Sequence, residues 1–198
     1  MAAIAVAGVG MMVMCSSSLA AALMMGGEEK EDPVVATKDV TTPVVPVIEK
    51  YRYVRIYRDQ PAVLDAGGHW MNPAEVEVFS GGVNVAAGKT VTGSSLYAAQ
   101  FPHSNLVDGN KTNFAHTNNA AVEWFLIDLG EEYEIDSVAI TNRVGGSQAR
   151  MENTKIQLSQ TSAMTSIEPE DESRVITKAE APSASFTWTV ATDTMVVA

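Results

Sequence analysis

The stretch Tyr51-Arg52-Tyr53-Val54-Arg55-Ile56-Tyr57 decides the fold class, because its side chains alternate in character. Val54 and Ile56 fall on one face, whereas the aromatic and basic side chains around them fall on the other. A period of two residues is the repeat of a β-strand, in which successive side chains point to opposite faces. The stretch therefore predicts a strand with one face in an apolar core.

Similar short segments recur along the chain. They are rich in β-branched or aromatic residues, which favour strands, and they comprise Glu75–Phe79, Trp124–Leu129, Ser137–Asn142, Lys155–Ser159 and Phe186–Val190. Turns separate them at Gly67-Gly68, Gly81-Gly82, Asp108-Gly109-Asn110 and Gly145-Gly146. This pattern is typical of an all-β sandwich or barrel, which we expect over residues 48–198. Within it, the acidic run Glu168-Pro169-Glu170-Asp171-Glu172 is expected to be a solvated loop, with a calcium-binding cluster as the alternative.

Residues 1–27 carry no charged side chain and are rich in Ala, Met, Val and Leu. A helix of about 20 apolar residues spans a bilayer, so we predict a retained transmembrane helix here. A cleaved signal segment is an alternative, although such segments begin with basic residues and the first one in this chain is Lys30. A buried helix of a soluble protein is the third possibility.

Residues 28–47 begin with an acidic cluster and continue with Val, Thr and Pro, a composition that predicts a semi-stiff linker. A strand along the edge of the domain is the alternative. Cytoplasmic flanks of membrane helices are enriched in Lys and Arg, whereas this flank is net acidic. We therefore expect a single-pass membrane protein whose β-domain is non-cytoplasmic or lies within a virion shell.

The charge and cysteine content exclude several classes of function. The net charge is −11, from 13 basic and 24 acidic residues, whereas nucleic-acid binding needs a basic surface. Cys15 is the single cysteine, so no intrachain disulfide is possible. The sequence has no Gly-x-Ser-x-Gly, Gly-rich phosphate-loop or His-Glu-x-x-His motif, and nothing selects a catalytic pair from its acids. We therefore expect a binding protein without enzymatic activity.

Three blocks carry a resemblance to a known family: NVAAGKTVTGSS at residues 84–95, NLVDGN at residues 105–110 and WFLIDLG at residues 124–130. They resemble the discoidin, or galactose-binding-like (F5/8 type C), family, and within it the fucose-binding F-type lectins. The resemblance spans roughly residues 48–160. It implies a jelly-roll β-sandwich that binds a fucose-like or galactose-like glycan and does not catalyse a reaction.

A ligand-binding set is implied by the same resemblance. The F-type motif orders a His, an Arg, an Asp and a second basic residue, and here 26 residues separate His116 from Arg143, while Arg150 follows at the matching distance. Two arginines offer rigid forks of donors to sugar hydroxyls, and a histidine adds a directional donor or acceptor. Gly145 stands in place of the family's Asp, and Phe114 in place of one of its cysteines. Alternatively, the arginines pair with surface carboxylates and the histidine bonds to the backbone.

A structural calcium ion is the second implication of the resemblance. Its ligands would be the carbonyls of Asn105 and Asn110 and the carboxylate of Asp108, with Asn113 or Thr112 nearby. The family's remaining acidic ligand comes from a terminal strand reading Glu-Val-Glu-Val, which here stands at residues 75–78, before the other blocks. The terminal hairpin therefore resembles a circularly permuted one, and Glu75 would supply the ligand. Alternatively, Asp-Gly-Asn is only a tight turn.

Two functional classes follow. The first is a membrane-anchored, lectin-like module, and the second is a minor coat or capsid protein of a membrane-containing large DNA virus, in which the sandwich contacts neighbouring coat proteins. In both, residues 1–27 contact a lipid bilayer and nucleic acid is not a partner.

Overall fold

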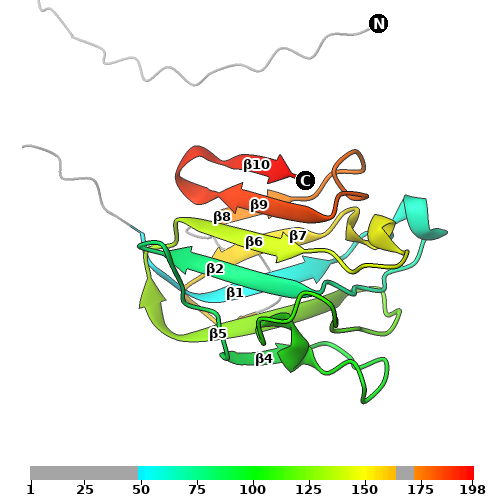
Figure 1. Cartoon of the computed structure of the whole chain (residues 1–198), viewed down its shortest axis with the longest axis horizontal. Helices are drawn as coiled ribbons and strands as arrows, with labels where there is room; N and C mark the ends of the chain where they lie inside the picture. Colours follow the sequence, from blue (N-terminus) through cyan, green and yellow to red (C-terminus); the bar gives the residue numbers. More distant parts are fainter. Residues whose placement is uncertain (1–48, 164–171) are drawn as a thin grey trace, which may run out of the picture. The chain divides into compact units, whose positions relative to one another are not determined.

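A computed structural model describes residues 49–163 and 172–198, which form an all-β sandwich of two five-stranded sheets (Figure 1). The all-β prediction is confirmed. The predicted helix over residues 1–27 and the linker over residues 28–47 lie outside the described residues. Among the residues that are described, no helix has the length and apolar character needed to cross a bilayer.

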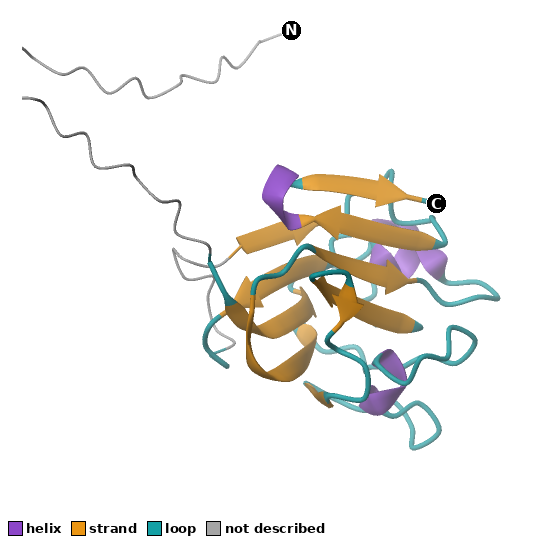
Figure 2. Cartoon of the chain, turned by 60° about the vertical axis from the view of Figure 1, so that its left-hand side comes forward, coloured by secondary structure: helices purple, strands orange, loops and turns teal. Residues whose placement is uncertain are grey.

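The two sheets divide the strands as follows. The first sheet has the order β4-β5-β1-β7-β8, with strands β1 (Tyr51–Arg58), β4 (Thr90–Gly93), β5 (Glu123–Tyr133), β7 (Lys155–Ser159) and β8 (Glu172–Val175). The second sheet has the order β10-β9-β6-β2-β3, with strands β2 (Glu75–Ser80), β3 (Val83–Asn84), β6 (Ser137–Thr141), β9 (Ser185–Thr189) and β10 (Thr194–Val197). Short 3-10 segments connect them: η1 (Val63–Asp65), η2 (His103–Leu106), η3 (Gln148–Met151) and η4 (Val190–Thr192). Figure 2 shows the strands as two layers, with the connecting loops at their ends.

The core lies between the facing sheets. In the first sheet Val54 stands opposite Ile127 on β5 and Leu158 on β7, and all three side chains are fully buried. In the second sheet Val138 stands opposite the buried Trp188. These rows are the alternate, apolar positions of their strands, so burial of one face of each strand accounts for the pairing register.

The first two strands, β1 and β2, lie in the interior of different sheets. Antiparallel partners flank β1 on both sides, β5 and β7, and flank β2 on both sides, β6 and β3. They do not pair with each other as the expected terminal hairpin, because they lie in different sheets. Residues 59–74 cross between the sheets instead.

Some strands carry no apolar alternation and were not predicted. The predicted loop at residues 168–172 lies outside the described residues except for Glu172, which begins β8. β8 pairs with the outer edge of β7, and the ladder hydrogen bonds of this pair need no apolar side chains. Similarly, β10 pairs only with β9, along the edge of the second sheet. Edge strands depend on the neighbouring strand more than on their own sequence pattern.

Candidate functional site

The three predicted sugar-binding residues converge at one end of the sandwich. Arg143 follows β6, Arg150 lies on η3, and His116 lies in the connection that leads to β5. The Arg150 Nη1 atom is 3.3 Å from His116 Nε2. The amide oxygen of the fully buried Asn72, oriented to meet its donors, lies 2.9 Å from Arg143 Nη1 and 3.1 Å from Arg150 Nη1. Asn72 therefore joins the two guanidinium groups, a role that the sequence did not predict.

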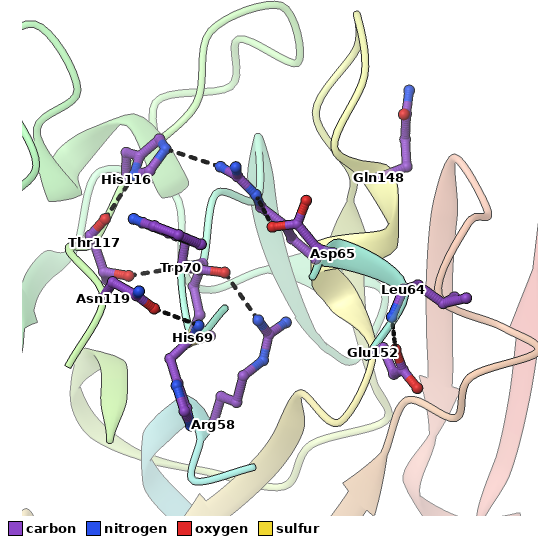
Figure 3. A network of polar contacts seen from close by, with 12 residues as sticks. Arg58, Leu64, Asp65, His69, Trp70, His116, Thr117, Asn119, Gln148 and Glu152 are labelled. Atoms are coloured by element: carbon purple, nitrogen blue, oxygen red, sulfur yellow. Dashed lines mark hydrogen bonds and ion pairs between the residues drawn. The ribbon is translucent and has the colours of Figure 1, made fainter. Parts of the chain in front are cut away.

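His116 is held as a neutral imidazole. Its Nδ1 atom lies 2.6 Å from the carbonyl oxygen of Thr117, so we assign the proton to Nδ1 (Figure 3). Nε2 then keeps its lone pair and accepts a hydrogen bond from Arg150. Burial lowers the pKa of His116 below its ordinary value of 6.5, and the charges of Arg150 and Arg143 lower this pKa as well. At neutral pH the ring therefore acts as an acceptor toward Arg150.

This titration predicts a dependence of stability on pH. As the pH falls through 6.5, the imidazole of His116 takes up a proton in the unfolded chain but stays neutral in the folded site. The free energy of unfolding should therefore decrease as the pH is lowered from 6.5. We expect His116→Gln, which cannot titrate, to lose less stability than the wild type between about pH 8 and about pH 5 in urea unfolding experiments. Parallel stability curves for the two proteins would contradict the assignment.

Asp65 supplies the acid that orients Arg150. Its Oδ2 atom lies 2.6 Å from Arg150 Nε, and both side chains are partly buried. Figure 3 shows Asp65 and His116 on either side of one guanidinium, which the contacts identify as that of Arg150. The sequence predicted no acid here, because Gly145 replaces the residue expected to do this. Asp65 lies 85 residues from Arg150, and no spacing rule indicates such a pair.

A compact turn positions Asp65. The turn is closed by backbone hydrogen bonds from Ala62 N to Gly68 O and from Gly67 N to Ala62 O, both 2.9 Å. It is fixed to the segment around η3 at two points. The Leu64 amide donates to the buried Glu152 carboxylate at 2.8 Å (Figure 3). The Asn153 side chain donates to the Pro61 carbonyl at 2.9 Å. The turn that carries Asp65 and the segment that carries Arg150 are therefore joined.

Asn142 positions the loop that carries Arg143. Its side-chain nitrogen donates to the carbonyls of Gln148, at 3.0 Å, and Ser183, at 2.9 Å. Its side-chain oxygen accepts from the Arg143 amide at 2.9 Å. Asn142 is buried, so these bonds form where water does not compete for them. One amide thus fixes both ends of the loop between Arg143 and Gln148.

Aromatic rings surround the polar groups. The Arg143 guanidinium lies 4.1 Å from the ring centroid of Phe114, and Phe114 stacks on Phe101 at 4.6 Å. The Tyr97 ring lies 4.4 Å from that of His116 and is 53% exposed. On the other side, Arg150 lies 5.0 Å from the ring of Trp70. The site therefore combines guanidinium donors with apolar surface, and Phe114 contributes to the wall at the position where a cysteine was expected.

The predicted metal residues form a second cluster, around the Asp108-Gly109-Asn110 turn. The Glu75 carboxylate, at the start of β2, accepts the Gly109 amide at 3.1 Å. The Asp108 carboxylate accepts from the Asn110 amide at 2.8 Å and from the Asn113 side chain at 2.7 Å. The Asn105 side chain closes the base of the loop by donating to the Phe114 carbonyl at 2.9 Å. The structure thus brings all five predicted residues into one segment and its neighbouring strand.

This cluster holds buried oxygen atoms without donors. Glu75 Oε2 and Asn113 Oδ1 are buried and accept no hydrogen bond. Burial raises the pKa of Glu75 to about 7, and the charges of Asp108 and Glu77 raise it as well. Among the described residues no group of three or more His, Cys, Asp or Glu side chains has an arrangement suited to a metal. A metal here would therefore depend on carbonyl and amide oxygens, which calcium accepts.

Comparison with known proteins supports the resemblance to the galactose-binding-like family. Residues 105–195 match the family model described as "NedA-like, galactose-binding domain" within F5/F8 type C. The match to an F5/F8 type C, galactose-binding-like domain thus covers slightly less than half of the chain. The matched part of this galactose-binding-like domain includes Asp108, His116, Arg143 and Arg150. Asp65, Asn72 and Glu75 precede it, so the N-terminal strands and their connection complete both clusters from outside the matched segment.

One relative supports the assignment of the galactose-binding-like domain. The chain is 40% identical over 70 residues to fucolectin-6 of Anguilla japonica, an alignment that covers 30% of this chain and 38% of fucolectin-6. The chain therefore spans well under half the length of that relative. No solved structure matches the chain. Whether the galactose-binding-like domain is circularly permuted relative to its family stays a prediction.

Proposed function

We propose that the domain is a non-catalytic, lectin-like module that binds a fucose-like or galactose-like glycan at His116, Arg143 and Arg150. The observation that carries the proposal is the convergence of these three side chains: Asn72 joins Arg143 to Arg150, and His116 bonds to Arg150. The spacing of His116, Arg143 and Arg150 in the sequence implied that they bind one ligand, and the contacts among them support this. The family of residues 105–195 and the similarity to a protein named fucolectin-6 support the same function.

The chemistry of the site suits a neutral sugar ring. Sugar hydroxyls accept from charged, rigid guanidinium donors, and His116 Nε2 orients one of these donors by accepting from Arg150. Tyr97 and Phe114 offer apolar surface to the nonpolar face of the ring. Asp65 and Asn72 hold the guanidinium groups before a ligand arrives. Such preorganisation reduces the entropy that binding would otherwise cost.

We also propose that a structural calcium ion binds at the Asp108-Gly109-Asn110 turn. Glu75 and Asp108 would supply carboxylate oxygens, and Asn105, Asn110 and Asn113 would supply carbonyl or amide oxygens. The buried, donor-free oxygens of Glu75 and Asn113 fit a cation. When bound, calcium would neutralise these carboxylates. The loop that it stabilises leads through Phe114 to His116, so the ion would support the sugar site indirectly.

Glycan-array screening followed by calorimetry tests the proposed function. The domain is expected to bind glycans that end in fucose or galactose, and to bind methyl α-L-fucopyranoside or methyl β-D-galactopyranoside in solution. A protein that binds neither methyl glycoside and no array glycan, and that instead captures neighbouring coat proteins, would favour the coat-protein alternative.

Display on a membrane is the remaining part of the proposal, and it rests on the uncharged sequence of residues 1–27. We expect the full chain to float with liposomes in a density gradient. A chain that begins at residue 48 should stay at the bottom of that gradient. Equal flotation of the two chains would contradict membrane insertion through this segment.

A further inference from the structure

The charges around the sugar site do not balance. Three guanidinium groups, those of Arg58, Arg143 and Arg150, lie in or beneath it. Arg58 is fully buried and donates to the Trp70 carbonyl at 2.9 Å. Only two carboxylates, Asp65 and Glu152, are available to these arginines. The buried Glu123 also acts on His116, but its carboxylate is held by the hydroxyls of Ser94 and Ser95 and by the Ala120 amide. The three arginines therefore carry one more positive charge than the two carboxylates beside them.

Arg143 is the group without an acidic partner. No carboxylate lies within ion-pair distance of it among the residues that the structure describes. Its Nε atom is buried and has no hydrogen-bond partner, while Nη1 reaches the neutral Asn72. Burial and the charge of Arg150 lower the pKa of Arg143, and no acid offsets this effect. Gly145, two residues further on, supplies no side chain to compensate.

We propose that the sugar recognised at this site is anionic and carries a sulfate ester or a carboxylate that pairs with Arg143. This inference rests on the proposed glycan-binding function and adds the charge of the ligand to it. A guanidinium binds an oxyanion through two parallel hydrogen bonds, which are stronger than its bonds to a hydroxyl. A single negative charge also matches the one guanidinium that has no carboxylate beside it among the described residues.

The positive charge of this site contrasts with the negative net charge of the whole chain. The chain carries a net charge of −11, so an anionic ligand approaching elsewhere meets repulsion. The partly buried site is screened by salt less than an exposed arginine would be. A positive site in an acidic chain therefore selects one anionic group at a defined position and does not attract anions generally.

Calorimetry with matched ligands tests the proposal. The neutral probes are methyl β-D-galactopyranoside and methyl α-L-fucopyranoside. The anionic probes are their monosulfated derivatives and, for galactose, the methyl glycoside of galacturonic acid. We expect at least one anionic probe to bind about tenfold more tightly than its neutral parent, as a charge-assisted hydrogen bond provides. The sulfate and carboxylate arms show which anion is preferred.

In Arg143→Gln, the dissociation constant of the neutral probe divided by that of its anionic derivative should fall to about one. This substitution removes the charge but keeps polar atoms at the position. Arg52→Gln is the matched control: it removes the same charge at a partly exposed ion pair with Asp128 on the first sheet, and it should leave the ratio unchanged. If Arg143→Gln does not fold or binds nothing, salt gives a second measure. Raising NaCl from ~0.02 M to ~0.5 M should lower the wild-type ratio.

The outcomes separate the inference from the function on which it rests. Neutral glycosides that bind as tightly as every anionic probe would overturn the anionic inference and leave the lectin function standing. A ratio that survives Arg143→Gln, or that does not respond to salt, would overturn it as well. Failure of every probe, neutral and anionic, would overturn both proposals.

Discussion

Arg150→Ala is expected to abolish measurable glycan binding. Arg150 contacts Asp65 through Nε, and both His116 and Asn72 through Nη1, so it joins every polar part of the site. Its loss removes a charged donor and leaves the partly buried Asp65 without its cation. The loss of a hydrogen bond from a charged donor to the ligand costs about 1.5–3 kcal/mol, or at least about tenfold in Kd. Calorimetry with the tightest-binding glycoside measures the loss.

Two further variants make the Arg150 result specific. Arg52→Ala also removes an arginine from an ion pair, but on the first sheet, and it should bind the glycan as the wild type does. Asp65→Asn keeps the size of the side chain and weakens the hold on Arg150, so its binding should be weaker than wild type but stronger than that of Arg150→Ala. Wild-type affinity in Arg150→Ala, with the fold intact by circular dichroism, would contradict the proposed site.

Removal of calcium with a chelator is expected to lower the melting temperature of the protein. Without the cation, the Glu75 carboxylate is buried beside Asp108 and Glu77, and its Oε2 atom accepts no hydrogen bond. Binding at a free calcium concentration of about 100 Kd stabilises a fold by about 2.7 kcal/mol. For a domain of this size that corresponds to roughly 5–10 °C. Thermal melting with excess calcium and with chelator measures the difference.

Glu75→Gln should remove the response to calcium. In chelator this variant should be at least as stable as the wild type, because the amide carries no charge to bury. Glu131→Gln is the control, since the exposed Glu131 lies in β5 and bonds to the hydroxyl of Tyr133. It should respond to calcium as the wild type does. A wild-type midpoint that is the same with calcium and with chelator would count against the metal.

The sequence predicted the core strands well. Val54 and Ile56 in β1, and the apolar positions of β5, β6, β7 and β9, have the two-residue period that burial of one face imposes. The edge strands β8 and β10 lack that signal, because their partners in the sheet determine them. The crossing of residues 59–74 between sheets was also not predicted, since β1 and β2 have similar patterns and nothing local assigns them to different sheets.

The candidate site was predicted in part. His116, Arg143 and Arg150 follow a spacing that a family motif records, and the structure brings them together. Asn72 and Asp65 come from the N-terminal connection, and they meet the arginines only because β1 and β2 occupy opposite sheets. No local pattern marks a buried Asn or a turn Asp as part of a site. The alternative interpretation also holds in one respect, because Arg150 does pair with a carboxylate and His116 does bond to the backbone.

Solution NMR gives the most direct test of glycan binding at this site. The isotope-labelled domain would be titrated with the methyl glycoside that binds best, and the backbone amides and arginine Nε–H signals would be followed. We predict that the largest shifts occur at Arg143 and Arg150 and at the amides of His116 and Asn72, and that they saturate together with one Kd. Saturable shifts confined to other parts of the sandwich, or none at all, would contradict the account.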